Sequence, residues 1–135
     1  MKEIRLEAKT DNLDKVLKFV EQQMQQVDCP PKTLAMIHIS VEEIFVNVAH
    51  YAYEGGDGDV TVSVDFKNNP SMVEIVISDE GAFFDPLAKQ DPDIHLSAQE
   101  RDPGGLGIFM VKQSMDDVMY EYRDGKNILT LQKRL

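Results

Sequence analysis

The sequence has few of the groups from which a protein builds covalent or metal cross-links. It contains one cysteine, Cys29, in 135 residues, so an intramolecular disulfide is excluded. The three histidines, His38, His50 and His95, are scattered along the chain and do not form a zinc-ligand set with that thiol. We therefore predict a fold without a structural metal.

Long hydrophobic runs are missing as well. No stretch approaches the ~18 consecutive apolar residues of a membrane-spanning helix, and residues 1–13 have no apolar segment behind their charges. We predict a cytoplasmic protein without membrane contact. No tract rich in Pro, Ser or Gly marks a linker or a repeat, so we expect residues 1–135 to form a single domain.

Positive charge is scarce. The chain has 14 Lys and Arg residues against 24 Asp and Glu residues, which gives a formal net charge of −10. Such a surface repels polyanions, so DNA and RNA are excluded as expected partners. The charge is compatible with a basic protein partner or with a nucleotide bound through backbone amides and Mg²⁺. It is equally compatible with acidity that only provides solubility.

Hydrophobic periodicity and turn signals divide the chain into helices and strands. The expected elements, in chain order, are a strand at 2–8, a helix at 11–27 with Asp11 as a candidate cap, a helix at 32–53, a strand hairpin at 60–66 and 73–77, a polar loop at 87–103, a helix from 104–107 to about 115, and a strand pair at 118–122 and 129–131. This order predicts an α+β two-layer sandwich, with the helices on one face of a mostly antiparallel, mixed sheet.

The helix expected at 32–53 has two distinct stripes. The apolar stripe, which is an ordinary core face, consists of Ile37, Val41, Ile44 and Val48. The second stripe is a polar ridge of Ser40, Glu43, Asn47, His50 and Glu54. Helical geometry puts Glu43 on the same side as Asn47, whereas Glu42 points about 140° away from Asn47. The ridge predicts a site that contains Glu43 and Asn47, and a solvated helix face is the alternative interpretation.

Two glycine-containing segments could also contact a ligand. Asp79 ends a buried strand, so its carboxylate could accept a hydrogen bond from an amino group such as N6 of adenine, while Gly81 lets a flat ligand approach. An ordinary turn is the alternative. Gly104-Gly105-Leu106-Gly107 leads into a helix, where backbone amides and the helix dipole favour phosphate, although a flexible turn would use the same residues. The segment matches neither a Walker loop nor a dinucleotide fingerprint, and no G-x-S-x-G elbow indicates a hydrolase.

Together, in this order, these segments resemble the GHKL (Bergerat) ATPases, which have the histidine-kinase-like ATPase fold. The matching motifs are Glu43-x-x-x-Asn47, Asp79-x-Gly81-x-x-Phe84-Asp85-Pro86 and Arg101-x-x-Gly104-Gly105-Leu106-Gly107-Ile108. Within that superfamily, the short length, the Phe84-Asp85-Pro86 extension and the closing Tyr120-x-x-Arg123-x-Gly125-x-Asn127 pattern are similar to the anti-sigma factor serine/threonine kinases.

The resemblance implies a serine/threonine protein kinase with ATP and Mg²⁺ as cofactors. It implies that Asn47 coordinates Mg²⁺, that Glu43 orients or deprotonates the attacking hydroxyl, and that Asp79 reads the adenine. Further nucleotide contacts are implied for Gly81, Arg101, Gly104, Gly105, Leu106, Gly107 and Asn127, with residues 87–103 as an ATP lid.

The resemblance also implies partners. The acceptor would be a serine or threonine of a small anti-sigma factor antagonist, a sigma factor would be a second partner, and the expected assembly is a homodimer. The sequence departs from many relatives at Tyr51, where they carry a histidine, and Arg101 is the only cation near the glycines. These departures keep open a non-catalytic module in which ATP or ADP only sets the conformation that grips a regulator.

Overall fold

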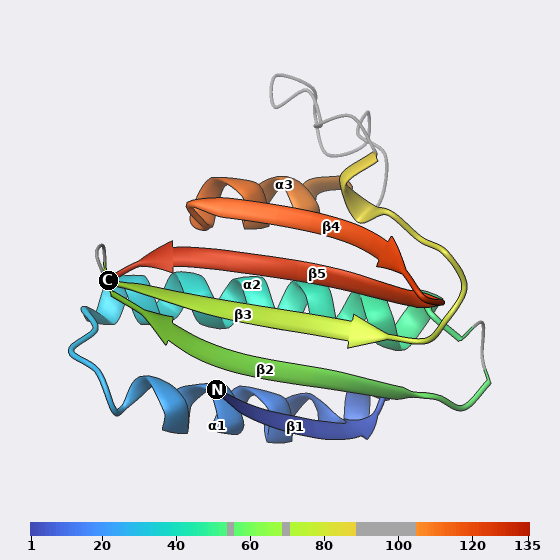
Figure 1. Ribbon diagram of the computed structural model, residues 1–135, viewed down its shortest axis with the longest axis horizontal. Coiled ribbons are helices and arrows are strands. Elements are labelled where there is room, and N and C mark those ends of the chain that lie inside the picture. Colours follow the sequence, from blue (N-terminus) through green and yellow to red (C-terminus); the bar gives the residue numbers. More distant parts are fainter. Residues whose placement is uncertain (54–55, 69–70, 89–104) are drawn as a thin grey trace.

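One curved β-sheet forms a complete layer of the molecule. The computed structural model describes residues 1–53, 56–68, 71–88 and 105–135. Its strands are β1 (Lys2–Glu7), β2 (Asp59–Lys67), β3 (Met72–Asp79), β4 (Asp117–Arg123) and β5 (Lys126–Arg134). They lie in the order β1-β2-β3-β5-β4, and every neighbouring pair among the described strands is antiparallel (Figure 1). The sheet expected to be mostly antiparallel is therefore antiparallel in each of these pairs.

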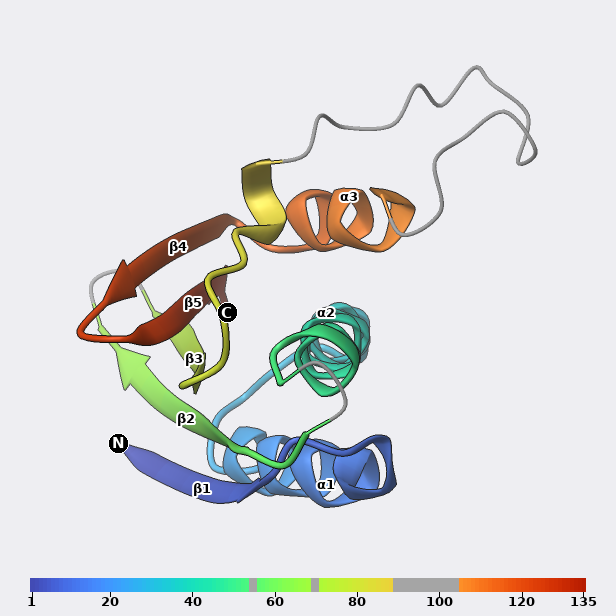
Figure 2. The same ribbon diagram turned by 90° about the vertical axis from the view of Figure 1, so that its right-hand side faces the viewer.

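The helices form the second layer, on one face of this sheet (Figure 2). They are α1 (Leu13–Met24), α2 (Pro31–Tyr51) and α3 (Gly105–Ser114), with short 3₁₀ turns at Thr10–Asn12 and Pro86–Ala88. α2 packs between α1 and α3. The two-layer α+β arrangement expected from the sequence is confirmed. No helix in the described part of the chain is both long and apolar enough to cross a membrane.

Local signals explain most helix and strand boundaries. α2 begins at Pro31, where the fixed φ of proline suits the first helical turn and its missing N–H costs nothing. Asp124 and Gly125 form the turn between β4 and β5, and both have the positive φ that a tight hairpin requires. The start of α1 differs from the prediction. Asn12 takes the cap position in place of Asp11, without a side-chain cap, and its amide donates instead to the carbonyl of Glu7.

The core lies between the two layers. Alternate residues of the strands point inward and are almost completely buried, namely Val60, Val62, Val64, Val73, Ile75, Ile77, Leu129 and Leu131. The apolar stripe of α2 packs against them through Ile37, Val41 and Ile44. Val48, the last member of that stripe, is only half-buried. This change marks the place where the core gives way to a cavity.

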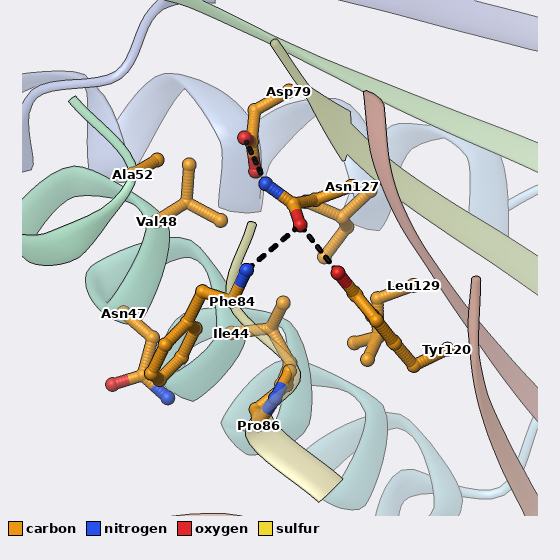
Figure 3. Close-up of a pocket in the computed structure, with 11 residues that line it drawn as sticks. Ile44, Asn47, Val48, Ala52, Asp79, Phe84, Pro86, Tyr120, Asn127 and Leu129 are labelled. Atoms are coloured by element: carbon orange, nitrogen blue, oxygen red, sulfur yellow. Dashed lines mark hydrogen bonds between the residues drawn. The ribbon is translucent and has the colours of Figure 1, made fainter. Parts of the chain in front are cut away.

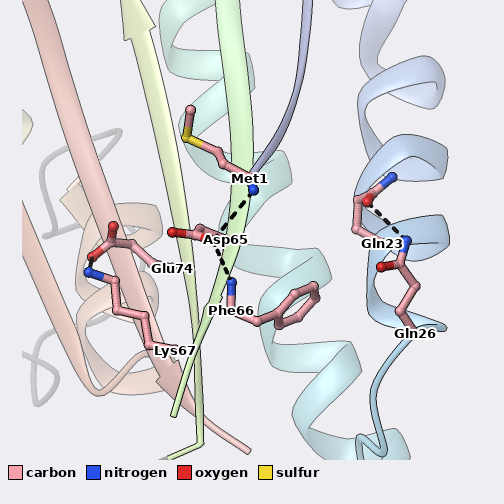
Figure 4. A network of polar contacts seen from close by, with 7 residues as sticks. All are labelled: Met1, Gln23, Gln26, Asp65, Phe66, Lys67 and Glu74. Atoms are coloured by element: carbon pink, nitrogen blue, oxygen red, sulfur yellow. Dashed lines mark hydrogen bonds and ion pairs between the residues drawn. The ribbon is translucent and has the colours of Figure 1, made fainter.

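The sheet end at the start of β3 is held together by surface charges (Figure 4). Lys67 pairs with Glu74 across β2 and β3 at 3.5 Å, and the N-terminal amine lies 3.7 Å from Asp65. Solvent-exposed ion pairs of this kind contribute little to stability. At the other end, where β3 stops, two polar side chains, those of Asp79 and Asn127, are buried.

Candidate functional site

A cavity opens where the C-terminal half of α2 faces the ends of three strands. It encloses about 410 Å³, including its open mouth. Its wall consists of Ile44, Asn47, Val48, Ala52, Ile77, Asp79, Phe84, Pro86, Tyr120, Asn127 and Leu129 (Figure 3). The wall is mostly apolar with a few polar groups, which is typical of a small-molecule site. Three residues predicted from the sequence, Asn47, Asp79 and Asn127, therefore line one cavity.

Asp79 provides the buried carboxylate of this cavity. It continues the inward-facing alternation of Val73, Ile75 and Ile77, so it points under the helices and only 6% of it is exposed. Its Oδ1 accepts hydrogen bonds from the backbone N–H of Gly81 at 2.9 Å and from the amide of Asn127 at 3.0 Å. The carboxylate thus closes a local turn and also faces the cavity. The turn interpretation of Asp79 is therefore confirmed by the Gly81 hydrogen bond, and its contact with a ligand stays a prediction.

Asn127 lies directly opposite Asp79 because β3 and β5 pair in that register. It is 7% exposed, and its Nδ2 also donates to the carbonyl of Ala82 at 2.9 Å. A buried amide of this kind is costly unless its hydrogen bonds are satisfied, so this one ties two strands to the segment that follows β3. Asn127 lines the cavity and contacts Asp79, and its contact with a nucleotide stays a prediction.

Gly81 has a packing role in the structure. A Cβ atom at this position would collide with the carbonyl oxygen of Ala52, at the end of α2, and the next N–H, that of Ala82, donates to the same oxygen at 2.9 Å. Gly81 therefore faces α2 and does not line the cavity wall. Only glycine allows the chain leaving β3 to approach the helix this closely.

Glu43 and Asn47 occupy the same side of α2, as helical geometry predicts, and both are half-buried. Glu42 is exposed. The carboxylate of Glu43 lies against the first turn of α3, since a Cβ at Gly107 would collide with its Oε1. Gly107 thus lets the helix start and the carboxylate come together. Glu43 and Gly107, which the sequence predicted as site residues from distant parts of the chain, are therefore neighbours.

The burial of the other residues of the polar ridge changes from one end of the ridge to the other. Ser40 is completely buried, and its Oγ has no hydrogen-bond partner among the residues that the structure describes. His50 is exposed, and its ring meets that of Tyr51 edge-on at 6.0 Å. The ridge is therefore not a continuous solvated face, because it enters the protein at its N-terminal end.

Several sequence predictions fall on residues outside the described part of the chain. These are Glu54, Arg101, Gly104 and nearly all of the segment 87–103 expected to form a lid. Gly105 and Leu106 are placed only as the first backbone positions of α3. The glycine segment does run into a helix, as expected, and its proposed contacts with phosphate stay a prediction.

Two tyrosines near the site were missed by sequence reasoning. Tyr120 lines the cavity, and the alternation of β4, which turns Val118 inward as well, could have placed it there. No comparable sequence pattern indicated a role for Tyr53. Its hydroxyl donates to the carbonyl of Asp59 and accepts from the backbone N–H of Glu80, so it fastens the end of β3 to the start of β2. Burial raises the pKa of Tyr53, which keeps this hydroxyl protonated.

The described residues of this site could hold a divalent cation only together with phosphate oxygens. Among the described residues, no group of three His, Cys, Asp or Glu side chains could hold a metal ion. Mg²⁺ commonly binds through one or two protein oxygens, with phosphates and water as the remaining ligands. The Asn47 amide oxygen in the cavity wall satisfies that modest requirement.

Comparisons with known proteins agree with this fold. A family model described as a histidine kinase-like ATPase domain matches residues 6–133. The serine-protein kinase RsbW of Bacillus pumilus is 33% identical over 97 residues, which cover 68% of this chain and 60% of that protein. The serine/threonine-protein kinase BtrW of Bordetella bronchiseptica is 28% identical over 93 residues, which cover 69% of this chain and 65% of that protein.

The matched region spans less than two thirds of the length of these relatives, 60% and 65% respectively. A solved structure, the RsbU and RsbW domains of Rv1364c from Mycobacterium tuberculosis, aligns with 100% of this chain and 33% of its own at a TM-score of 0.64. The sequence identity there is 13%, so this likeness concerns the fold alone.

Proposed function

The chain belongs to the histidine kinase-like ATPase domain family, and from this membership we propose that it is an ATP-dependent serine/threonine protein kinase. The proposed substrate is a serine or threonine of a small anti-sigma factor antagonist protein. The observation that carries the proposal is the contact between Glu43 of α2 and Gly107 of α3, one helical turn from Asn47 in the cavity wall. That contact brings a carboxylate, an amide and a helix N-terminus to one place.

The base of the nucleotide would enter the cavity beside Asp79. The carboxylate accepts hydrogen bonds, so it fits the N6 amino group of adenine and opposes the carbonyl oxygen that guanine has at the equivalent position. Ile44, Val48 and Ile77 offer apolar surface to a flat ring. This arrangement favours ATP over GTP.

The phosphates would extend toward the start of α3. The first N–H groups of a helix lack partners within the helix and carry partial positive charge, which suits phosphate oxygens. Asn47 would hold Mg²⁺, which neutralises phosphate charge when bound. Glu43, next to that helix start, would orient the attacking hydroxyl and accept its proton. Phosphoryl transfer needs positioning and charge neutralisation more than covalent help, so these few groups suffice.

The names of the relatives support the proposed type of reaction. RsbW is named a serine-protein kinase and BtrW a serine/threonine-protein kinase. We extend the proposal to a sigma factor as the protein that the kinase sequesters and to a homodimer as the assembly. Both extensions rest on the family resemblance of the motifs.

A second candidate is a nucleotide-binding module without efficient transfer. Tyr51, in place of the histidine of many relatives, favours it. Tyr51 is 54% exposed, and its ring stacks on that of Phe84, a residue of the cavity wall, at a centroid distance of 5.8 Å.

Two measurements on the wild-type protein test the proposal. Calorimetric titration with Mg²⁺ present should give clear binding of ATP and ADP and weak binding of GTP. Radiolabelled γ-phosphate should then pass from ATP to a purified antagonist protein encoded by a neighbouring gene. Equal affinity for ATP and GTP, or no binding, would overturn the assignment of Asp79. Selective binding without transfer would support the non-catalytic module.

A further inference from the structure

The amide of Asn127 has its orientation fixed by its surroundings. Its Oδ1 accepts hydrogen bonds from two donors, the backbone N–H of Phe84 at 3.1 Å and the hydroxyl of Tyr120. Its Nδ2 faces acceptors only, Asp79 Oδ1 at 3.0 Å and the carbonyl of Ala82 at 2.9 Å. A rotated amide would oppose oxygen to oxygen and N–H to N–H, so one orientation is strongly preferred.

Tyr120 is the outer member of this chain of hydrogen bonds. Its ring lies in the cavity wall, and its hydroxyl points at Asn127 (Figure 3). Burial raises the pKa of Tyr120, which keeps the hydroxyl in its donor form. The donor is therefore present throughout the neutral pH range.

The fixed orientation of the Asn127 amide determines which of its atoms contacts Asp79. Both groups that contact the Oδ1 of Asp79, the N–H of Gly81 and the amide of Asn127, can only donate, so they hold this oxygen as a hydrogen-bond acceptor. With Oδ1 occupied in this way, Oδ2 is the oxygen left to a ligand in the cavity. As an acceptor, Oδ2 suits an amino group and opposes a carbonyl oxygen.

We infer that Tyr120 and Asn127 form a hydrogen-bond relay that fixes Asp79 as an acceptor and thereby sets the selectivity for the nucleobase. Both are positioning residues that act through Asp79. The inference rests on the proposed ATP site and adds to it the residues that give that site its polarity. The relay joins three strands, since Tyr120, Asn127 and Asp79 lie on β4, β5 and β3.

Inosine triphosphate is the appropriate probe, because it has a carbonyl in place of the amino group of ATP at C6, together with a hydrogen on N1. The measured quantity is the ratio of ATP affinity to ITP affinity, obtained by calorimetry with Mg²⁺ present. A general loss of folding lowers both affinities and leaves this ratio unchanged. A change in the polarity of Asp79 alters the ratio itself.

Tyr120→Phe removes one hydroxyl and keeps the ring. We expect the ATP-to-ITP ratio to fall by roughly three- to tenfold, the range that corresponds to one hydrogen bond. Tyr122→Phe is the matched control. That ring is 45% exposed, lies on the same strand and meets Phe83 edge-on at 5.3 Å, outside the cavity wall. It should leave the ratio at the wild-type value.

Asn127→Asp reverses the polarity of the relay and is the stronger test. Two carboxylates about 3 Å apart share a proton between their facing oxygens, which lowers the negative charge that Asp79 Oδ2 presents to a ligand and with it the preference for an amino group. The ratio should fall at least tenfold below the wild-type ratio at pH 6. At pH 8 both nucleotides should bind weakly. The wild-type protein is measured at both pH values as the baseline, because other ionisable side chains lie near Asp79 and Asn127. These are Tyr53, Glu80, Tyr120, Tyr122 and Asp85.

The outcomes separate this inference from the proposed function. If the wild type binds neither nucleotide, the ATP site itself is wrong. If the wild type prefers ATP and both Tyr120→Phe and Asn127→Asp keep that preference within twofold, the ATP site stands and the relay is refuted. A fall in both variants, with Tyr122→Phe unchanged, supports the relay. Thermal unfolding checks that each variant is folded, and Tyr120→Phe decides alone if Asn127→Asp is not.

Discussion

The two ends of the cavity are built in opposite ways. At the base end, Asp79 and Asn127 are almost fully buried and hold each other and the neighbouring backbone through hydrogen bonds. At the phosphate end, Glu43 and Asn47 are half-buried and hydrogen-bond no other described residue through their side chains. The base end is organised before a ligand arrives, whereas the phosphate end has groups that a ligand and its metal could organise. Under the proposed function, the residues for recognition and those for chemistry would thus lie in separate places.

The largest test of this difference concerns Glu43. Glu43→Gln keeps the shape but removes the basic carboxylate, and general-base contributions are about 10² to 10⁴ in rate. Transfer of labelled phosphate should fall by that factor, while ATP affinity, governed by the base end, should change little. Glu42→Gln is the matched control, because the side chain of Glu42, the residue before Glu43, is exposed. Transfer by Glu43→Gln at the wild-type rate would remove Glu43 from the mechanism.

Asn47→Ala addresses the metal at the same end. An interaction with a charged group is worth about 1.5–3 kcal/mol, so ATP affinity in Mg²⁺ should fall by roughly ten- to hundredfold. Affinity in EDTA should stay close to the wild-type value, since the base contacts are intact. An equal loss in both buffers would make Asn47 a structural residue of α2.

The two glycines should respond differently to alanine. Gly81→Ala places a methyl group against the backbone of Ala52, which cannot move aside, and should lower the free energy of unfolding by about 1–3 kcal/mol. Gly107→Ala meets only the carboxylate end of Glu43, which can rotate away, so the fold should lose less and phosphate transfer should suffer more. Urea denaturation compares the two variants, and equal losses of stability would contradict the comparison.

Tyr53→Phe is expected to have the smallest effect. It removes the hydroxyl that joins Asp59 to Glu80, and loss of such a hydrogen bond costs about 1 kcal/mol of unfolding free energy. Tyr51→Phe, at an exposed position, serves as the control in the same denaturation experiment. If the two variants were equally stable, the Tyr53 hydroxyl would not be needed to hold the base end.

The sequence predicts those parts of the site that depend on local geometry. A helix puts Glu43 and Asn47 on one side without reference to anything else, and strand alternation points Asp79 inward. It does not predict contacts that depend on the packing of distant segments. Gly81 gave no sign that α2 would end against it, and Ser40 read as part of a polar face although it is buried.

The relay illustrates the same limit. Asn127 and Asp79 are 48 residues apart and meet only through the register of β3 and β5. The family motif identified Asn127 as a residue of interest, and its partners required the sheet. Tyr120 was visible as an inward-facing residue of its strand, but nothing local connected its hydroxyl with the base end.

The pairing of β3 with β5 also has a consequence for how the protein is made. Contacts between segments this far apart form late, because the intervening chain must close into a loop first. On a ribosome, the cavity has no complete wall until residues 126–134 have left the exit tunnel. A nascent chain that carries α2 and β3 would therefore not yet bind nucleotide. Cellular ATP would stabilise only the finished sheet, in proportion to its concentration relative to Kd.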